Sequence, residues 1–261
     1  MPNLKKILKK ISIFLLIGYV GTGLFLYLNQ RSLLYFPTPN ISTAYTQMTL
    51  QNEGESIHII VLNKGQKNAI LYFGGNAESM AQSSDEIARQ FPSFTVYLMD
   101  YRGYGGSTGE ASEEGLYSDA LKLYDTVKPK HDGIAIGGRS LGSGIATYVA
   151  AHREVFKLAL ITPFDSIINV AQEMYPIFPI SLLLHDTYDS LSRIKEIKAK
   201  TLIVIAQKDN IITKERTQQL INAFDTDQLQ VMTIQNRGHI DISSDASYYK
   251  MMQDFIGEGC D

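Results

Sequence analysis

The stretch "GIAIGGRSLGSGIA", residues 133–146, holds a serine between two glycines at a spacing of two residues on either side. The apolar run before the serine predicts a short buried strand, and the residues after it predict a helix. Gly138 to Gly142 fit the pattern G-x-S-x-G, which sets a serine on a strained strand-to-helix turn. Cβ atoms at Gly138 and Gly142 would collide with the neighbouring strand and helix, so the turn needs glycine there. We therefore expect Ser140 to be an exposed nucleophile.

Strand-like and helix-like segments alternate on both sides of this turn. Mostly continuous apolar runs predict strands that are buried on both faces, near residues 56–62, 69–73, 95–99, 134–136, 158–161, 201–206 and 230–234. Helix-length segments lie near residues 77–90, 112–127, 141–152, 213–224 and 243–256. This alternation predicts an α/β fold, in which a mostly parallel central sheet carries helices on both faces. Functional residues are then expected at the carboxyl ends of the strands.

A serine hydroxyl needs a base to remove its proton, and three histidines follow Ser140 in the chain. His239 lies directly after the last expected strand, where a loop can bring an imidazole over the sheet edge. His152 falls inside the helix that follows the serine, and His185 falls in a surface segment between strands. His239 is therefore our candidate base.

The base needs an acid to orient it, and Asp209 follows the strand at 201–206 at its carboxyl end. Asp165, after the preceding strand, is the alternative, although an aspartate there fits an N-cap of the next helix. Asp241 fits a cap of the final helix or a solvent-exposed position. Asp209 is the candidate that completes the set with Ser140 and His239.

The turn after the strand at 69–73 is Gly74-Gly75-Asn76-Ala77. Glycines allow the backbone to approach a substrate closely, and a turn at this place supplies an oxyanion donor in strand-turn-helix hydrolytic sites. We expect the backbone N–H groups of Asn76 and Leu141 to form the oxyanion hole. The alternative is an ordinary turn in which Asn76 caps the following helix.

Residues 1–10 carry four lysines, and residues 11–28 form an uncharged run of 18 residues. A helix of that length spans about 27 Å, close to the hydrocarbon thickness of a bilayer. Lysines before the span predict a cytoplasmic N-terminus, which places the rest of the chain on the extracytoplasmic, periplasmic side. A cleaved signal peptide is the alternative, but no A-x-A-like site follows the run.

Composition excludes several functions. The formal net charge is −3, and no long basic run lies beyond the N-terminus, which argues against nucleic-acid binding. The single cysteine, Cys260, permits no intramolecular disulfide and no cysteine-based metal site. No metal or organic cofactor is expected.

A long segment, residues 163–199, connects two of the expected strands. Its apolar, aromatic part includes Tyr175, Phe178 and Leu183, which predicts a small lid or an acyl pocket above the site. Ordinary packing of a crossover helix is the alternative. The expected organisation is therefore a basic segment at 1–10, a membrane anchor at 11–28, a linker and domain entry at 29–55, and a catalytic domain at 56–261.

Several stretches together resemble the α/β-hydrolase family, and in particular its branch of membrane-anchored serine hydrolases: "YFGGNAES", "DYRGYGGSTG", "GRSLGSGIA", "VIAQKDNII" and "RGHIDI". The resemblance implies an α/β-hydrolase fold behind one transmembrane helix and a triad of Ser140, Asp209 and His239. It departs from the family at Gly74, where a histidine is usual. In "DYRGYGGSTG", which marks the family, we expect Arg102 to tie its loop to a carboxylate, such as Asp100 or one on a neighbouring loop; a contact with substrate is the alternative.

The expected reaction is hydrolysis of a carboxylic ester, a lipid ester or an acyl thioester through an acyl-enzyme. Its expected partners are that small-molecule or lipid substrate and the membrane. Two alternatives remain at this level: a peptidase of the same fold, and a catalytically silent binding protein tethered to the membrane. Fold alone does not decide between them.

Overall fold

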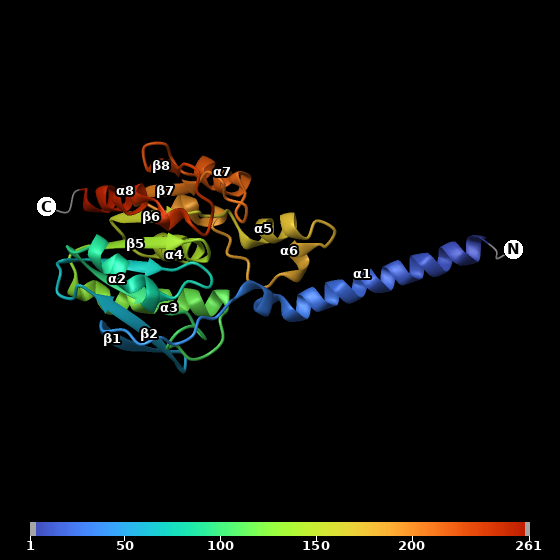
Figure 1. Cartoon of the computed structure of the whole chain (residues 1–261), viewed down its shortest axis with the longest axis horizontal. Coiled ribbons are helices and arrows are strands. Elements are labelled where there is room, and N and C mark those ends of the chain that lie inside the picture. The colour runs from blue at the N-terminus through green and yellow to red at the C-terminus, as the bar shows by residue number, and fades with distance from the viewer. Residues whose placement is uncertain (1–3, 259–261) are drawn as a thin grey trace.

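The computed structural model describes residues 4–258, and Cys260 lies outside this range. Helix α1, Leu4–Leu34, projects from the domain as a single long rod (Figure 1). By length and composition it is apolar enough to cross a membrane, and none of its most apolar stretch is buried. The helix is longer at its C-terminal end than the expected span, because residues 29–34 continue it up to the domain.

Within residues 4–258, eight strands form one sheet in the order β1-β2-β4-β3-β5-β6-β7-β8. The β1–β2 and β2–β4 pairs are antiparallel, and all the other pairs are parallel. The strands are β1 Thr46–Asn52, β2 Glu55–Leu62, β3 Asn68–Phe73, β4 Phe94–Met99, β5 Ile134–Arg139, β6 Lys157–Ile161, β7 Lys200–Ala206 and β8 Leu229–Ile234.

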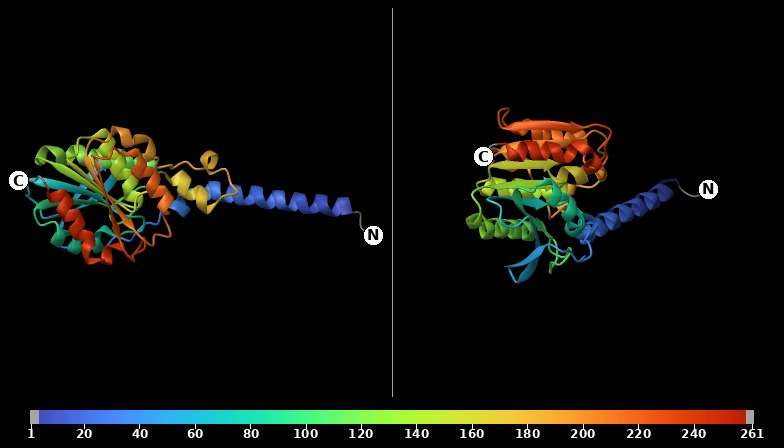
Figure 2. Two further views of the ribbon diagram at one scale, coloured as in Figure 1. Left: turned by 90° about the horizontal axis from the view of Figure 1, so that it is seen from above. Right: turned by 60° about the vertical axis from the view of Figure 1, so that its left-hand side comes forward.

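Helices cover both faces of the sheet (Figure 2). The α-helices after α1 are α2 Met80–Gln90, α3 Glu113–Val127, α4 Leu141–His152, α5 Ile167–Met174, α6 Ile180–Leu183, α7 Lys214–Ala223 and α8 Ala246–Gly257. Short 3-10 turns span Lys128–Lys130, Leu191–Glu196 and Ile242–Ser244. The fold class predicted from the sequence, a mostly parallel sheet between two helical layers, is confirmed.

Two hydrophobic cores hold these layers together, one on each face of the sheet. Helices α3, α4 and α7 contribute to one core, for example through Leu123, Ile145 and Leu220. Helices α2 and α8 contribute to the other, through Ile87 and Phe255 among others. Because successive side chains of a strand point to opposite faces, the continuous apolar strands supply both cores at once.

One strand was not expected from the sequence. β1 lies inside the stretch 29–55 that was interpreted as a linker, and it pairs with β2 at the edge of the sheet. Only Leu50 of its seven residues is buried, so β1 lacks the apolar run that marks the inner strands. As an edge strand, it is held mainly by its ladder with β2.

Candidate active site

Ser140 stands between the end of β5 and the start of α4, with φ 49° and ψ −117°. Positive φ is uncommon for a residue with a Cβ and costs about 1–3 kcal/mol. Hydrogen bonds hold the turn: the Ser140 N–H donates to Ile161 O on β6 at 2.9 Å, and the Ser143 N–H donates to Ser140 O at 2.8 Å. The turn therefore presents the Ser140 hydroxyl at the carboxyl edge of the sheet.

The flanking glycines are required by close backbone contacts. A Cβ at Gly138 would lie 2.4 Å from Gly142 O, and a Cβ at Gly142 would lie 2.0 Å from Phe73 O. Both distances are far inside van der Waals contact. The first turn of α4 can therefore pack directly against the end of β3.

The side chains of Ser140, His239 and Asp209 lie in one hydrogen-bonded chain. The His239 Nε2 and Ser140 Oγ atoms are 2.8 Å apart, and the His239 Nδ1 and Asp209 Oδ2 atoms are also 2.8 Å apart. His239 is buried, with an exposed fraction of 8%. A carboxylate only accepts hydrogen bonds, so Nδ1 carries the imidazole proton and Nε2 is free to accept the serine proton.

Asp209 is itself fixed by the backbone. Its Oδ1 atom accepts hydrogen bonds from the N–H groups of Ile211 at 2.9 Å and Ile212 at 2.8 Å. The Lys208 N–H donates to Arg237 O at 2.8 Å, which joins the loop after β7 to the loop after β8. The acid and the base are thus held on two loops that are tied together.

The structure places the alternative residues elsewhere. His152 ends α4, and His185 is exposed beside Tyr27 of α1. Asp165 is buried and forms an ion pair with Arg216, whose Nη1 lies 2.9 Å from Asp165 Oδ2.

The capping prediction for Asp165 was wrong, and of the two alternatives for Asp241 the structure shows the solvent-exposed position. The N-cap of α5 is Ser166 rather than Asp165, and the N-cap of α8 is Asp245 rather than Asp241. Each true cap is the residue whose side chain accepts an N–H from the first turn of its helix. Asp241 instead accepts from the Gly238 N–H at 2.7 Å, which lowers the pKa of its carboxyl and shapes the loop that holds His239.

Asn76 lies in the turn after β3. Its side-chain oxygen accepts from the Phe36 N–H at 3.0 Å, and its amide donates to Leu34 O. The cap of α2 is Ser79, so Asn76 does not cap that helix. Within residues 4–258, the backbone N–H groups of Asn76 and Leu141 donate no hydrogen bond to another described residue.

Two tyrosines from the loop after β4 support this turn. Tyr101 Oη donates to Gly74 O at 2.6 Å, and Tyr104 Oη donates to Asn76 Oδ1 at 2.7 Å. Burial raises the pKa of both phenols well above the ordinary value, so both remain protonated donors. The motif "DYRGYGGSTG" therefore acts on the site through its tyrosines, which the sequence analysis did not single out.

Gly74 occupies the position at which the resembling family has a histidine. A Cβ at Gly74 would lie 2.3 Å from Met80 Cε, so Met80 fills the space that a side chain there would take. Glu78 orders the turn in another way: its Oε2 atom accepts from the Gly75 N–H at 2.7 Å.

Arg139 links this turn to the loop of His239. Its Nη2 atom donates to His239 O at 3.1 Å and to Ile240 O at 3.0 Å, and its Nη1 atom lies 3.7 Å from Glu78 Oε2. In the sequence, the place of Arg139 beside Ser140 leaves open a structural role or a role in shaping the pocket. A charged residue beside the nucleophile was the only signal available.

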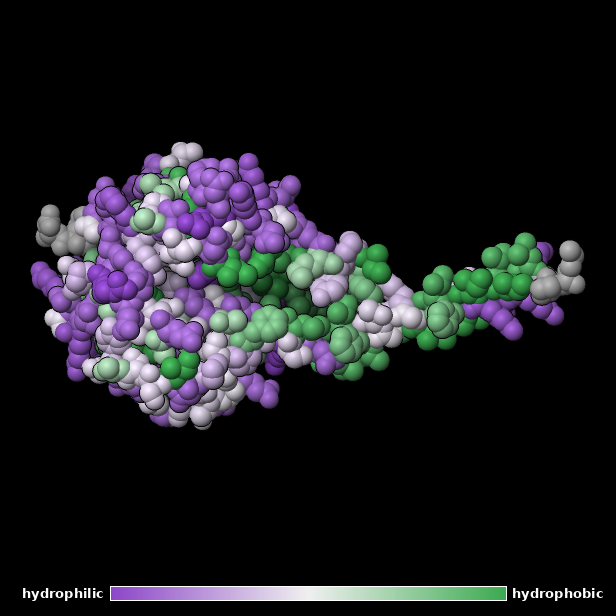
Figure 3. All heavy atoms as spheres, in the orientation of Figure 1, coloured by the Kyte–Doolittle hydropathy of each residue, from purple (hydrophilic) through white to green (hydrophobic). Residues whose placement is uncertain are grey.

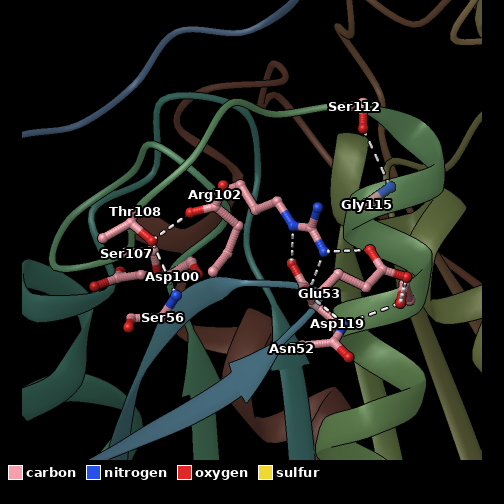
Figure 4. A network of polar contacts seen from close by, with 12 residues as sticks. Asn52, Glu53, Ser56, Asp100, Arg102, Ser107, Thr108, Ser112, Gly115 and Asp119 are labelled. Carbon is pink, nitrogen blue, oxygen red and sulfur yellow. Dashed lines mark hydrogen bonds and ion pairs between the residues drawn. The ribbon is translucent and has the colours of Figure 1, made fainter.

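Arg102 does pair with a carboxylate, but the partner is on α3 (Figure 4). Its guanidinium donates to both oxygens of the buried Asp119, at 2.8 and 2.9 Å, and to Glu53 at 2.8 Å. Asp100 instead contacts His58, with 2.8 Å between Asp100 Oδ2 and His58 Nδ1. The ion pair fixes the loop whose tyrosines reach the site.

The three residues expected in a lid or pocket lie in the α5–α6 segment. Tyr175 and Leu183 line an apolar pocket between this segment and α1. Phe178 is buried and stacks on Tyr19 of α1, with ring centroids 4.9 Å apart. The segment thus packs against the projecting helix.

The model of the serine hydrolase (FSH1) family matches residues 76–241, a range that includes Ser140, Asp209 and His239. The chain belongs to this family of serine hydrolases. An uncharacterized protein of Mycobacterium tuberculosis is 31% identical to this serine hydrolase over 221 residues, which cover 78% of each chain. The alpha/beta hydrolase domain-containing protein 17B of Xenopus laevis is 23% identical, over 91% of this chain and 84% of its own.

Among solved structures, the esterase Pf2001 of Pyrococcus furiosus superposes with a TM-score of 0.66 at 14% identity, over 85% of this chain and 97% of the esterase. At that identity the likeness concerns the fold. The fold of this serine hydrolase is therefore the α/β-hydrolase fold expected from the sequence, and the expectation of an α/β-hydrolase-type enzyme is confirmed.

Proposed function

We propose that this serine hydrolase cleaves carboxylic esters or acyl thioesters through an acyl-enzyme formed on Ser140. The observation that carries the proposal is the hydrogen-bonded chain from Ser140 Oγ through His239 to Asp209, with 2.8 Å at each step. This is the spacing that proton transfer between a nucleophile and its base requires.

The mechanism follows from these contacts. Ser140 Oγ attacks the acyl carbonyl while its proton moves to His239 Nε2, and Asp209 stabilises the imidazolium that forms. The Asn76 and Leu141 N–H groups receive the negative charge of the tetrahedral oxygen; each such donor typically contributes about 10²–10³ in turnover. His239 then protonates the leaving alcohol or thiol. Water, deprotonated by His239, releases the acid and restores Ser140.

We also propose that α1 is retained as a membrane anchor. It carries an uncharged run of 18 residues behind four lysines, which favours a cytoplasmic N-terminus and a catalytic domain on the extracytoplasmic side. Such a location suits an acyl substrate that partitions into or near the membrane.

A fluorophosphonate probe tests the nucleophile. We expect the probe to label the wild-type protein and the control Ser192→Ala, whose serine is exposed on a distant turn, but not Ser140→Ala. Ester turnover should fall at least about 10⁴-fold in Ser140→Ala. Undiminished labelling or turnover of Ser140→Ala would remove Ser140 from the mechanism.

The leaving group is tested with matched substrates. We expect turnover of p-nitrophenyl esters and of the thioesters with the same acyl chains, and no turnover of aminopeptidase substrates. Preferential cleavage of the peptides would replace the esterase proposal with a peptidase.

A further inference from the structure

Residues 174–184, "MYPIFPISLLL", form an uncharged tip that includes the end of α5 and all of α6. Three of its large side chains face outward: Met174, Ile177 and Leu182 are 65%, 69% and 81% exposed. Figure 3 shows hydrophobic residues gathered over this region and along the projecting helix. A grouped apolar surface of this kind marks a contact with a partner or a membrane.

The tip is fastened along α1 rather than to the body of the domain alone. Near its far end, Tyr19 Oη donates to Ile177 O at 3.0 Å, and Tyr19 stacks on Phe178. Near the domain, Arg31 Nε lies 3.1 Å from Asp186 Oδ2. The tip and the helix therefore run side by side, as Figure 1 also shows for α1 and α6.

These contacts fix the depth of the tip relative to the anchor. The Arg31–Asp186 ion pair marks a polar level on both elements, and Tyr19 lies twelve residues nearer the N-terminus, a rise of about 18 Å along the helix. Half of the hydrocarbon thickness of a bilayer is about 15 Å. If residues 11–28 cross the membrane, the tip beside Tyr19 reaches through one leaflet.

Several backbone carbonyls of the tip accept hydrogen bonds from within the protein, as the interior of a bilayer would require. Gln172 Nε2 donates to the carbonyls of Tyr175 at 3.4 Å, Pro176 at 3.4 Å and Phe178 at 3.1 Å. Ile177 O accepts from Tyr19. Two prolines in the tip carry no N–H. Backbone groups inside a bilayer must find partners within the protein, and these carbonyls have found them.

An apolar pocket of about 150 Å³, open to solvent on one side, lies between α1 and the α5–α6 segment. Among its lining residues are Leu26, Leu33, Leu34, Val170, Ala171 and Leu183. At the domain end of the pocket, Leu34 O accepts from the amide of Asn76, in the turn that supplies the proposed oxyanion donor. Leu34 therefore links this pocket to the turn that holds Asn76.

We propose that residues 174–184 insert into the leaflet on the side of the domain, and that the pocket holds the acyl chain of a membrane lipid ester. The anchor helix then forms one wall of the substrate site, and the substrate enters from the bilayer. This inference rests on the proposed function, because the bound ester must reach Ser140.

Membrane insertion of the tip is tested by depth-dependent quenching in the full chain. Cys260→Ser removes the native thiol, and Ile177→Cys carries an environment-sensitive fluorophore in phosphatidylcholine vesicles. The control, Val231→Cys, lies on the edge strand β8 and is 42% exposed. We expect brominated acyl chains to quench the label at position 177 and not at 231. Equal, weak quenching at both positions would overturn insertion of the tip.

The pocket is tested by filling it. Ala171→Trp should lower hydrolysis of p-nitrophenyl laurate at least about tenfold relative to the butyrate ester, because each methylene removed from the pocket loses its burial. The control is Ala223→Trp on α7, which is half-buried and outside this pocket. Retained butyrate turnover shows that the variant is folded.

The acyl pocket and the nucleophile Ser140 are distinguished by different outcomes. An unchanged laurate-to-butyrate ratio in Ala171→Trp, with normal fluorophosphonate labelling, would overturn the acyl pocket and leave the nucleophile intact. An equal fall of the laurate-to-butyrate ratio in the control Ala223→Trp would show that this ratio reports general damage to the fold. That result would also overturn the acyl pocket. Absence of labelling in the wild-type protein would instead remove the proposed function.

Discussion

Arg139 holds two loops of the site at once. Its guanidinium donates to the carbonyls of His239 and Ile240, and it lies near Glu78, which orders the turn of Gly75. The imidazole of His239 is therefore positioned from two sides: by Asp209 at its ring and by Arg139 at its backbone. Arg139 touches no reacting atom, so we regard it as a positioning residue.

Replacing Arg139 by Met keeps the apolar stem and removes the hydrogen bonds. We expect kcat for an ester to fall about ten- to hundredfold while KM changes little, because a small misplacement of the base slows the chemical step. Arg139→Lys should recover part of the loss. A variant with an unchanged kcat and only a lower Tm would show that Arg139 acts on stability alone.

Gly142 tests how tightly the nucleophile turn is packed. A Cβ there would lie 2.0 Å from Phe73 O, so Gly142→Ala must push α4 away from β3. Overpacking of this kind costs about 1–3 kcal/mol, which lowers Tm by about 2–12 °C in a protein of this size. Gly257→Ala is the matched control, since a Cβ there meets nothing within 4 Å. Equal Tm values for the two variants in a thermal melt would contradict the crowding.

At the scale of elements, the loop after β4 joins α3 to the site. Arg102 binds the buried Asp119 of α3, and Tyr101 and Tyr104 of the same loop donate to Gly74 and Asn76 in the turn after β3. The ion pair of Arg102 with Asp119 thus fixes the loop from which Tyr101 and Tyr104 donate their hydrogen bonds.

Arg102→Met should leave the carboxylate of Asp119 buried without its partner. Breaking one side of a buried ion pair costs about 3–5 kcal/mol, and we expect a loss of this size in the free energy of unfolding measured with denaturant. The control is Arg153→Met, which breaks the exposed pair with Asp125 and should cost less than about 1 kcal/mol. Similar losses in both variants would argue against a special role for Arg102.

The elements that could be predicted from the sequence are those with a local signal. The strand before Ser140 and helix α4 follow from one apolar run and two glycines, and α4 spans the expected residues 141–152. β1 could not be predicted in this way, because Leu50 is its only buried residue and its stability comes from pairing with β2.

The candidate site likewise has a part with a local sequence signal and a part that depends on contacts between distant residues. Ser140, Asp209 and His239 could be chosen from the sequence because each directly follows an expected strand, and strand ends are visible in the sequence. Tyr19 and Phe178, which stack on each other, are 159 positions apart in the chain. The side-chain amide of Asn76 donates to the carbonyl of Leu34, which is 42 positions away. No local pattern encodes such contacts, so the packing of α1 against the α5–α6 segment and the turn of Asn76 emerges only from the folded chain.

For the whole molecule, the four lysines in the first turns of α1, ahead of its uncharged run, predict the orientation of this helix in a membrane. We expect a protease added to intact spheroplasts to digest the catalytic domain while a cytoplasmic marker protein survives, because the positive flank stays inside. Digestion that occurs only after detergent is added would place the domain in the cytosol and reverse the assignment.

Helix α1 joins the domain directly, because the chain is buried in the domain immediately after the helix ends. Tyr35, the residue after its last turn, is already buried, and its hydroxyl lies 2.8 Å from that of Tyr188. If α1 spans a membrane as proposed, this junction would hold the domain close to the membrane surface. Enzyme and acyl ester would meet by lateral diffusion in two dimensions, so the rate should follow the surface density of substrate rather than its bulk concentration.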